Sequence, residues 1–262
     1  MSATPSQRGE PSQAGEPSRA GERSQPGEPS RTGAPPPVVC LPFAGSGAGF
    51  YRAWRNRPGN RVTVLPVQLP GREELFGEEP FTDVIEAAAR LAPRVAELTA
   101  GAPGFALFGH SLGAVLAYEI VRELVRLGGP VPARLCVSGS PGPNTGRDDR
   151  ATGLDDDEFL SRVQEFAGYR HAAFDNPDLR ELLLPSLRAD VAMHENYKPS
   201  SNVPVAVPVT ALRGADDALV TAEQARQWRE VTSAGFTYRE LPGGHMYLAD
   251  APDTLLQTLA RA

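Results

Sequence analysis

A serine with glycines two residues to either side is the strongest candidate nucleophile in the sequence. It lies in the string Gly109-His110-Ser111-Leu112-Gly113, which occurs once in the chain. An apolar strand-like run, Phe105 to Phe108, precedes the string, and a helix-like pattern, Leu112 to Leu127, follows it. This strand-turn-helix context forces a serine onto a strained turn at a helix N-terminus, where N–H groups can stabilise an oxyanion. The sequence therefore predicts a nucleophilic serine here, rather than a turn that uses glycine only for packing.

Four histidines could supply the general base that a serine hydroxyl needs to act as a nucleophile. His110 belongs to the turn itself and should point away from Ser111. His171 and His194 fall in a long inserted region of the chain. His245 alone follows a late strand in a loop, so we expect it to act first as general base and then as general acid.

Two adjacent aspartates are candidates for the carboxylate that holds the histidine in the correct tautomer. Asp216 and Asp217 follow the expected strand Val209 to Leu212 and precede His245. In α/β-hydrolases, the catalytic residues follow one another along the chain in the order serine, aspartate, histidine. We favour Asp217, but adjacent side chains diverge, so Asp216 stays open as the alternative. Either aspartate could instead serve only to cap the helix near Thr221.

Two backbone N–H groups are needed to stabilise the oxyanion of an acyl-transfer reaction. Leu112, directly after the serine, should give one, and Ala44, in the loop Pro42 to Gly47 after the first strand, should give the other. A glycine-rich loop at this place could also cradle phosphates. However, the chain contains neither G-x-G-x-x-G nor G-x-x-x-x-G-K-S/T, so we disfavour nucleotide binding.

Short apolar runs alternate with amphipathic stretches from Pro37 onward. The expected strands are Val38 to Leu41, Val62 to Val67, Phe105 to Phe108, Leu135 to Ser138, Val209 to Leu212 and Phe236 to Glu240. The expected helices are Thr82 to Thr99, with Thr82 as N-cap and a kink or break at Pro93, Leu112 to Leu127, Thr221 to Val231, and one that starts near Pro252. This alternation predicts an α/β fold with a mostly parallel central sheet flanked by helices.

One connection, between Ser140 and Pro208, is far longer than those of a compact α/β unit. Its sequence predicts a helix over Leu154 to Ala167, whose first turn is acidic, and one or two more helices over Asp178 to Tyr197. We expect a helical lid at about residues 150–200, lying across the carboxyl edge of the sheet. The alternative is an ordinary helical excursion that packs against the body.

The first part of the chain repeats a six-residue unit that begins as PSQRGE and contains no large apolar side chain. Such units have nothing to bury, and their arginines and glutamates balance. The sequence therefore predicts a disordered tail over residues 1–35 and a single folded domain over residues 36–262. We expect the tail to be a spacer, with docking to a partner protein as the alternative.

Composition limits the partners and the compartment. The 262 residues are 40% hydrophobic and 22% charged, with a net charge of −6 and no block of basic residues, which argues against nucleic acid or an anionic membrane as a partner. The first 35 residues lack an apolar signal segment, and the longest apolar stretch, Phe105 to Val121, is interrupted by polar residues. Cys40 and Cys136 lie in strand-like runs, so we expect reduced thiols in a cytoplasmic protein, with a single disulfide as the alternative.

Taken together, the motifs resemble the stand-alone type II thioesterases of polyketide and nonribosomal peptide assembly lines, over residues 38–260. The strings that carry the resemblance are Leu41-Pro42-Phe43-Ala44-Gly45, Gln68-Leu69-Pro70-Gly71-Arg72, Gly109-His110-Ser111-Leu112-Gly113, Leu187-Arg188-Ala189-Asp190, Glu195-Asn196-Tyr197 and Gly243-Gly244-His245-Met246-Tyr247-Leu248. The catalytic serine, aspartate and histidine of that family match Ser111, Asp217 and His245. Two positions depart from the family pattern: Phe43 stands where tyrosine or histidine is more frequent, and Ser46 where glycine is usual.

The resemblance implies hydrolysis of acyl groups from the phosphopantetheine thiol of acyl or peptidyl carrier proteins, which clears stalled or aberrant chains, with no metal and no cofactor. A general carboxylesterase or lipase would share every catalytic residue and stays open, and a catalytically inactive binding module is a third possibility.

An acyl chain also requires an apolar channel. The candidates for its lining are Phe43, Met246 and, in the lid, Phe159, Phe166, Tyr169 and Leu183. We favour Phe43, Phe166 and Met246 as substrate-binding residues, although each lid residue could instead pack between helices.

Overall fold

The computed structural model describes residue 1 and residues 35–145, 150–167 and 172–261; the side chains of Phe166, Ala167 and Ala172 fall outside this description. The chain divides into two units, Met1–Ala34 and Pro35–Ala262. All helices and strands reported below belong to the second unit. The hexapeptide repeat, for which we predicted a disordered tail, lies outside the described residues.

Six parallel strands form the central sheet in the order β2-β1-β3-β4-β5-β6. They are β1 (Pro37–Leu41), β2 (Thr63–Pro66), β3 (Ala106–His110), β4 (Arg134–Ser138), β5 (Val209–Gly214) and β6 (Phe236–Leu241). Every residue of β3 is buried, as expected for a central strand covered on both faces. All six predicted strands are confirmed, with ends that differ by one or two residues, and the parallel sheet agrees with the predicted fold class.

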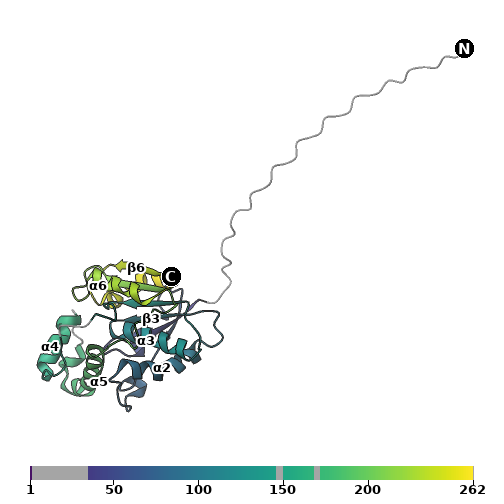
Figure 1. Cartoon of the computed structure of the whole chain (residues 1–262). Coiled ribbons are helices and arrows are strands. Elements are labelled where there is room, and N and C mark those ends of the chain that lie inside the picture. Colours follow the sequence, from purple (N-terminus) through teal and green to yellow (C-terminus); the bar gives the residue numbers. More distant parts are fainter. Residues whose placement is uncertain (2–34, 146–149, 168–171, 262) are drawn as a thin grey trace. The chain divides into compact units, whose positions relative to one another are not determined.

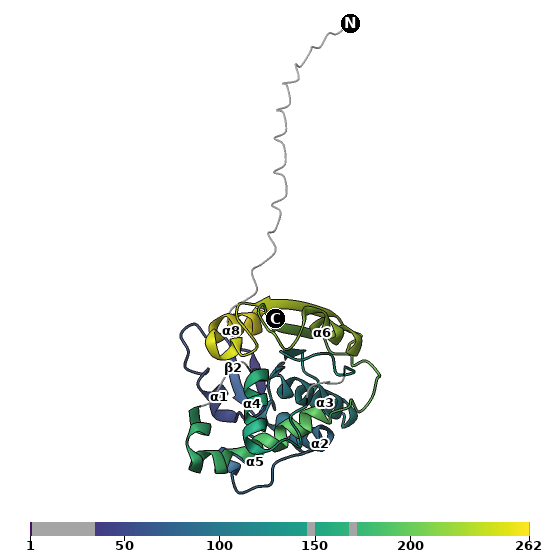
Figure 2. The ribbon, with the colours of Figure 1, turned by 90° about the vertical axis from the view of Figure 1, so that its left-hand side faces the viewer.

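Helices cover both faces of the sheet. The elements are α1 (Ala48–Arg52), η1 (Glu73–Leu75), α2 (Val84–Leu98), α3 (Leu112–Arg126), α4 (Asp156–Ala167), η2 (Ala172–Asp175), α5 (Pro177–Glu195), α6 (Ala222–Arg226), η3 (Gln227–Val231), α7 (Tyr247–Asp250) and α8 (Pro252–Arg261). Helices α2 and α3 lie on one face, and α1 and α8 on the other (Figure 1, Figure 2). Successive side chains of β1 point to opposite faces of the sheet. Val39 and Leu41 pack in the core beneath α2 and α3, whereas Val38 and Cys40 pack in the core beneath α1 and α8.

Helix α2 differs from the prediction at its start and at its proline. It begins after Asp83 rather than Thr82, because the Asp83 carboxylate accepts a hydrogen bond of 2.8 Å from the N–H of Glu86. The helix then runs through Pro93 to Leu98, so the expected break does not occur. A proline inside a helix costs about 3 kcal/mol, and burial of the apolar face of α2 against the core offsets this cost.

The long connection after β4 contains α4, η2 and α5, and α5 is a single helix that includes Pro185. Both ends of this insertion are anchored by buried carboxylates. Glu195 accepts the N–H groups of Ala151 and Thr152 at 2.6 and 3.1 Å, which joins the exit of the insertion to its entrance. Glu119, on α3, accepts the hydroxyl of Tyr197 at 2.7 Å. The insertion is therefore held to the body at its base.

Both cysteines are free and buried, as predicted, and β3 separates β1, with Cys40, from β4, with Cys136. Burial raises the pKa of Cys136 to about 11 and that of Cys40 still further. We therefore expect neither thiol to react with iodoacetamide in the native protein, and both to react after denaturation. Intact-protein mass spectrometry measures this directly, and rapid alkylation of the native protein would contradict it.

Within the described ranges, no helix is both long and apolar enough to cross a membrane. The same residues contain no cluster of three or more histidine, cysteine, aspartate or glutamate side chains that could hold a metal ion.

Candidate active site

Ser111 occupies a strained turn between β3 and α3. Its φ of 52° and ψ of −117° are unusual for a residue other than glycine, and its N–H donates to the carbonyl of Ser138 at 2.8 Å. The two flanking glycines permit this turn. A Cβ on Gly109 would lie 1.8 Å from the carbonyl oxygen of Gly113, and one on Gly113 would lie 2.5 Å from that of Leu41. The backbone packing thus requires glycine at both positions of the G-x-S-x-G string.

His245 lies in the loop between β6 and α7, and its Nδ1 is 2.9 Å from Oδ2 of Asp217. The other carboxylate oxygen of Asp217 accepts the N–H groups of Leu219 and Val220 at 2.9 and 3.1 Å. Burial raises the pKa of Asp217, but the hydrogen bonds from His245 and the two N–H groups outweigh it, so the pKa lies below its ordinary value. An ionised carboxylate in this position keeps the proton of His245 on Nδ1 and leaves Nε2 able to accept a proton.

The two adjacent aspartates face different environments. Asp217 is 4% exposed, whereas the side chain of Asp216 is exposed to solvent. It is Asp217 that accepts the hydrogen bond from Nδ1 of His245. The end of β5 also packs tightly on the histidine loop, since a Cβ on Gly214 would lie 2.1 Å from the carbonyl oxygen of Gly244. The geometry therefore favours Asp217 over Asp216.

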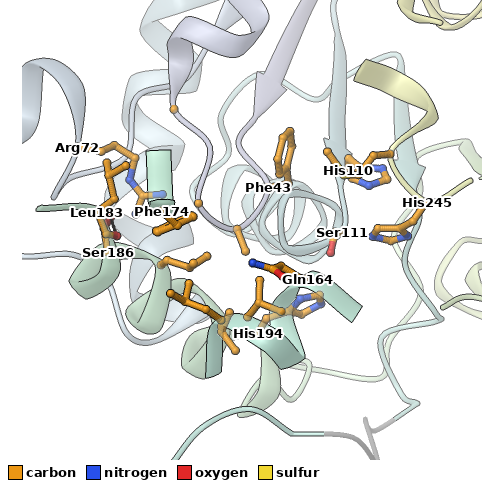
Figure 3. A pocket seen from close by; sticks show the side chains of 18 of the residues that line it. Phe43, Arg72, His110, Ser111, Gln164, Phe174, Leu183, Ser186, His194 and His245 are labelled. Carbon is orange, nitrogen blue, oxygen red and sulfur yellow. Dashed lines mark hydrogen bonds between the residues drawn. The ribbon is translucent and has the colours of Figure 1, made fainter. Parts of the chain in front are cut away.

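Ser111 and His245 line one pocket of about 310 Å³ (Figure 3). In the described part of the chain, their side chains are not hydrogen-bonded to each other, and such contacts often tighten only when substrate binds. The pocket lies beyond the carboxyl ends of β1 and β3, from which the chain leads into the Phe43 loop and the serine turn. The strand order reverses at β1, and open α/β sheets bind ligands at such a switch point.

The two expected oxyanion donors are free of competing acceptors. Ala44 follows β1 and lines the pocket. Its neighbour Gly45 donates its N–H to Asp190 at 2.8 Å. By contrast, the N–H groups of Ala44 and Leu112 meet no hydrogen-bond acceptor among the described residues. Leu112 also opens α3, where the helix dipole favours negative charge.

Some of the predicted substrate-binding residues line the pocket and others do not or are not described. Phe43 and Met246 line the pocket. The side chain of Phe166 lies outside the described residues, and so does the whole of Tyr169. Phe159 does not line the pocket, because it is 1% exposed within a buried cluster of residues from the insertion and therefore has the packing role that we had given as the alternative.

Sequence reasoning missed most of the residues that the insertion contributes to the pocket. Besides the candidate Leu183, the insertion contributes Leu160, Val163, Gln164, Phe174, Ser186, Leu187, Val191, His194 and Glu195. A signal was present on α5, where Leu183, Leu187 and Val191 are spaced by four residues and so share one face of the helix. His194, which we had set aside as a base because it lies in the insertion, also lines the pocket (Figure 3).

His110 packs beside the candidate base. Its ring is buried, with its centroid 4.7 Å from that of His245, and its Nδ1 lies 2.8 Å from Oγ of Ser138, which in turn contacts the hydroxyl of Tyr247 at 2.6 Å. Burial, followed by the nearby His245 and His194, holds the pKa of His110 well below its ordinary value. His110 is therefore a neutral wall of the site rather than its base.

Comparison with known proteins identifies the family. The model of the thioesterase domain family matches residues 36–262. The chain therefore belongs to the thioesterase domain family, and it is a hydrolase with the α/β-hydrolase fold. This confirms the fold and the family resemblance that the sequence motifs predicted.

Three similar proteins illustrate the relationship. Linear gramicidin dehydrogenase LgrE of Brevibacillus parabrevis is 34% identical over 222 residues, which cover 82% of each chain. The structure of RedJ, a thioesterase from the prodiginine biosynthetic pathway of Streptomyces coelicolor, is 36% identical, with a TM-score of 0.79 over 92% of this chain and 95% of RedJ. The structure of YbtT, a type II thioesterase from the yersiniabactin NRPS/PKS pathway, is 28% identical, with a TM-score of 0.80 over 89% of this chain and 95% of YbtT.

Proposed function

We propose that this protein hydrolyses acyl thioesters on the phosphopantetheine arm of acyl or peptidyl carrier proteins and so removes stalled or aberrant acyl groups from polyketide or nonribosomal peptide assembly lines. The observation that carries the proposal is the hydrogen bond between His245 and Asp217, with His245 and Ser111 lining a pocket that residues of the insertion also line. Relatives from prodiginine and yersiniabactin biosynthesis support the choice of substrate.

In the proposed first half-reaction, Ser111 Oγ attacks the thioester carbonyl carbon while Nε2 of His245 takes the hydroxyl proton. The N–H groups of Ala44 and Leu112 stabilise the oxyanion, and the Asp217 carboxylate stabilises the imidazolium. The C–S bond then breaks, and the phosphopantetheine sulfur leaves as a thiol with the proton from His245.

In the second half-reaction, a water molecule attacks the acyl ester on Ser111, and His245 again takes a proton and then returns it to the serine oxygen. The products are the free carboxylic acid and the regenerated enzyme. A pocket of about 310 Å³ is near the lower end of the ~300–1,000 Å³ typical of ligand sites. It therefore suits a small acyl group better than a long finished chain.

Two other activities give different expectations. A general carboxylesterase would use the same three residues, and would prefer simple oxygen esters to carrier-bound thioesters. The dehydrogenase name of one relative points to redox chemistry. The loop after β1 lacks the dinucleotide fingerprint, and in the helix that follows it, α1, the N–H of Gly49 is already bonded to the Glu73 carboxylate.

The proposal is tested with a panel of carrier proteins loaded with different acyl groups. Mass spectrometry should show the wild type releasing free carrier protein, with kcat/KM on at least one acyl carrier about tenfold or more above that on the p-nitrophenyl ester of the same acid. The matched control is Ser111→Ala, which should leave the carriers loaded. A preference for the simple ester would instead indicate a general carboxylesterase.

We also propose that residues 36–262 are the catalytic domain of a cytoplasmic protein and that residues 1–35 are a spacer. Deletion of residues 1–34 should then shift the melting temperature by less than about 2 °C and leave turnover of a small soluble thioester unchanged. Thermal unfolding and steady-state kinetics measure both quantities. If turnover falls on carrier-bound substrates alone, the segment docks the carrier and is not a spacer.

A further inference from the structure

A buried ion pair joins the insertion to Arg72, beside the loop that carries Ala44. Arg72 and Asp190 are 6% and 1% exposed, and their side chains meet in a two-point contact, with Nη1–Oδ2 and Nη2–Oδ1 distances of 2.6 and 2.8 Å. Asp190 lies on α5, whereas Arg72 lies between β2 and η1. Figure 3 shows Arg72 and Ser111 on opposite sides of the pocket, so the pair does not reach the reacting atoms directly.

The same two side chains hold the backbone of the Ala44 loop. Oδ2 of Asp190 accepts the N–H of Gly45 at 2.8 Å, and Nη1 of Arg72 donates to the carbonyl of Ser46 at 3.1 Å. Gly45 has a φ of 76°, which favours glycine. These two bonds fix the second half of the turn that begins at Phe43.

The orientation of the Ala44 N–H follows from this turn. The N–H and the hydroxyl of Ser46 both donate to the carbonyl of Phe43, at 2.9 and 2.8 Å. That carbonyl and the Ala44 N–H belong to one planar trans peptide, so they point in opposite directions. When the turn is held closed, the Phe43 carbonyl points into it, and the Ala44 N–H is therefore fixed pointing out of it.

We propose that Arg72 and Asp190 are positioning residues for the oxyanion hole: by accepting the Gly45 N–H, the carboxylate on α5 fixes the turn that presents the Ala44 N–H to the substrate. This inference rests on the proposed hydrolase function. It makes α5 part of the catalytic framework, because displacing α5 would release the Gly45 N–H and loosen one oxyanion donor. Arg72 balances the buried charge of Asp190 and also donates to the Ser46 carbonyl of the same turn.

Two matched double variants separate positioning from simple packing. Arg72→Met/Asp190→Leu replaces the pair by apolar side chains, an exchange that folded proteins often tolerate, and it removes the acceptor for Gly45. Arg72→Met/Asp190→Asn also removes the charges but keeps an amide oxygen that can accept the Gly45 N–H. Asp190→Asn alone is the third variant, and it keeps the acceptor with Arg72 in place. All are made in the full chain and checked by thermal unfolding.

Turnover of a p-nitrophenyl ester reports the effect, so the result does not depend on the carrier-protein assignment. We expect kcat to fall about 100-fold in Arg72→Met/Asp190→Leu, with KM within about threefold of the wild type. Affinity for an alkyl trifluoromethyl ketone, which becomes a tetrahedral oxyanion when the Ser111 oxygen adds to it, should fall by a similar factor. Asp190→Asn should keep kcat within about fivefold of the wild type, even where the melting temperature falls. Arg72→Met/Asp190→Asn, which also loses the bond from Arg72 to the Ser46 carbonyl, should have a kcat between those of Asp190→Asn and Arg72→Met/Asp190→Leu.

Equal kcat values in the leucine and asparagine double variants, or a loss confined to KM, would overturn the positioning role while leaving the proposed function intact. A loss in Asp190→Asn as large as that in Arg72→Met/Asp190→Leu would overturn it in the same way. Absence of Ser111-dependent turnover in the wild type would instead overturn the proposed function, and the positioning role with it.

Discussion

Replacing Ser111 by alanine should lower kcat on any acyl substrate by about 10⁴-fold or more, because it removes the hydroxyl on which the acyl intermediate forms. The strained backbone at φ 52° persists in the variant, and the change removes a single hydroxyl, so the melting temperature should stay within about 3 °C of the wild type. Steady-state kinetics and thermal unfolding measure the two effects separately.

The matched control for this prediction is Ser161→Ala. Ser161 lies on α4, is exposed and does not line the pocket. Its variant should keep full activity and stability. If Ser111→Ala retained more than about one-hundredth of the wild-type kcat, the role assigned to the serine turn would be wrong.

Replacing Asp217 by asparagine should lower kcat by about 10⁴-fold, close to the loss expected when a triad histidine is held in the wrong tautomer. An asparagine here can keep accepting the N–H groups of Leu219 and Val220 through its carbonyl oxygen. Its amide would then face Nδ1 of His245 as a donor, which favours the tautomer with the proton on Nε2. That tautomer cannot accept the proton from Ser111.

Asp216→Asn is the control for Asp217, because the two positions are adjacent and the chemical change is identical. The side chain of Asp216 is exposed and makes no hydrogen bond to His245, so its variant should remain within about threefold of the wild-type kcat. Equal losses from the two substitutions would show that neither carboxylate orients the histidine.

Local sequence was enough to predict the serine turn, because its geometry depends on neighbouring residues. The glycines of the G-x-S-x-G string leave no room for a side chain, since a Cβ at either position would lie 1.8 or 2.5 Å from a backbone oxygen, and an apolar strand and a helix flank them directly. His245 and the aspartate pair followed from chain order, since parallel strands bring their carboxyl ends to one edge of the sheet.

The choice between Asp216 and Asp217 could not be made from the sequence. It depends on the turn after β5, in which Asp217 accepts two N–H groups and is thereby turned toward His245. The residue pattern gives both aspartates the same place at the end of a strand. Only the folded turn separates a buried carboxylate from an exposed one.

The residues that line the pocket from the insertion also could not be predicted from the sequence, for a different reason. Which face of α5 meets the pocket depends on contacts with residues far along the chain, such as that between Asp190 and Arg72. The strings that contain these two residues contributed to the family resemblance, but nothing in either string indicates that they form a pair. Helix α2 shows the same limit. A local rule predicted a kink or break at Pro93, and packing with the core keeps the helix from ending there.

The central claim is that the acyl group passes through an ester on Ser111. The most direct measurement is to mix the wild-type enzyme with an acylated carrier protein, quench with acid during the first turnover, and map the acyl group by peptide mass spectrometry. We predict that the acyl group is found on the peptide that contains Ser111, and on none in Ser111→Ala. Release of the acid with no acyl-enzyme detected during the first turnover, or with the acyl group on another residue, would contradict the account.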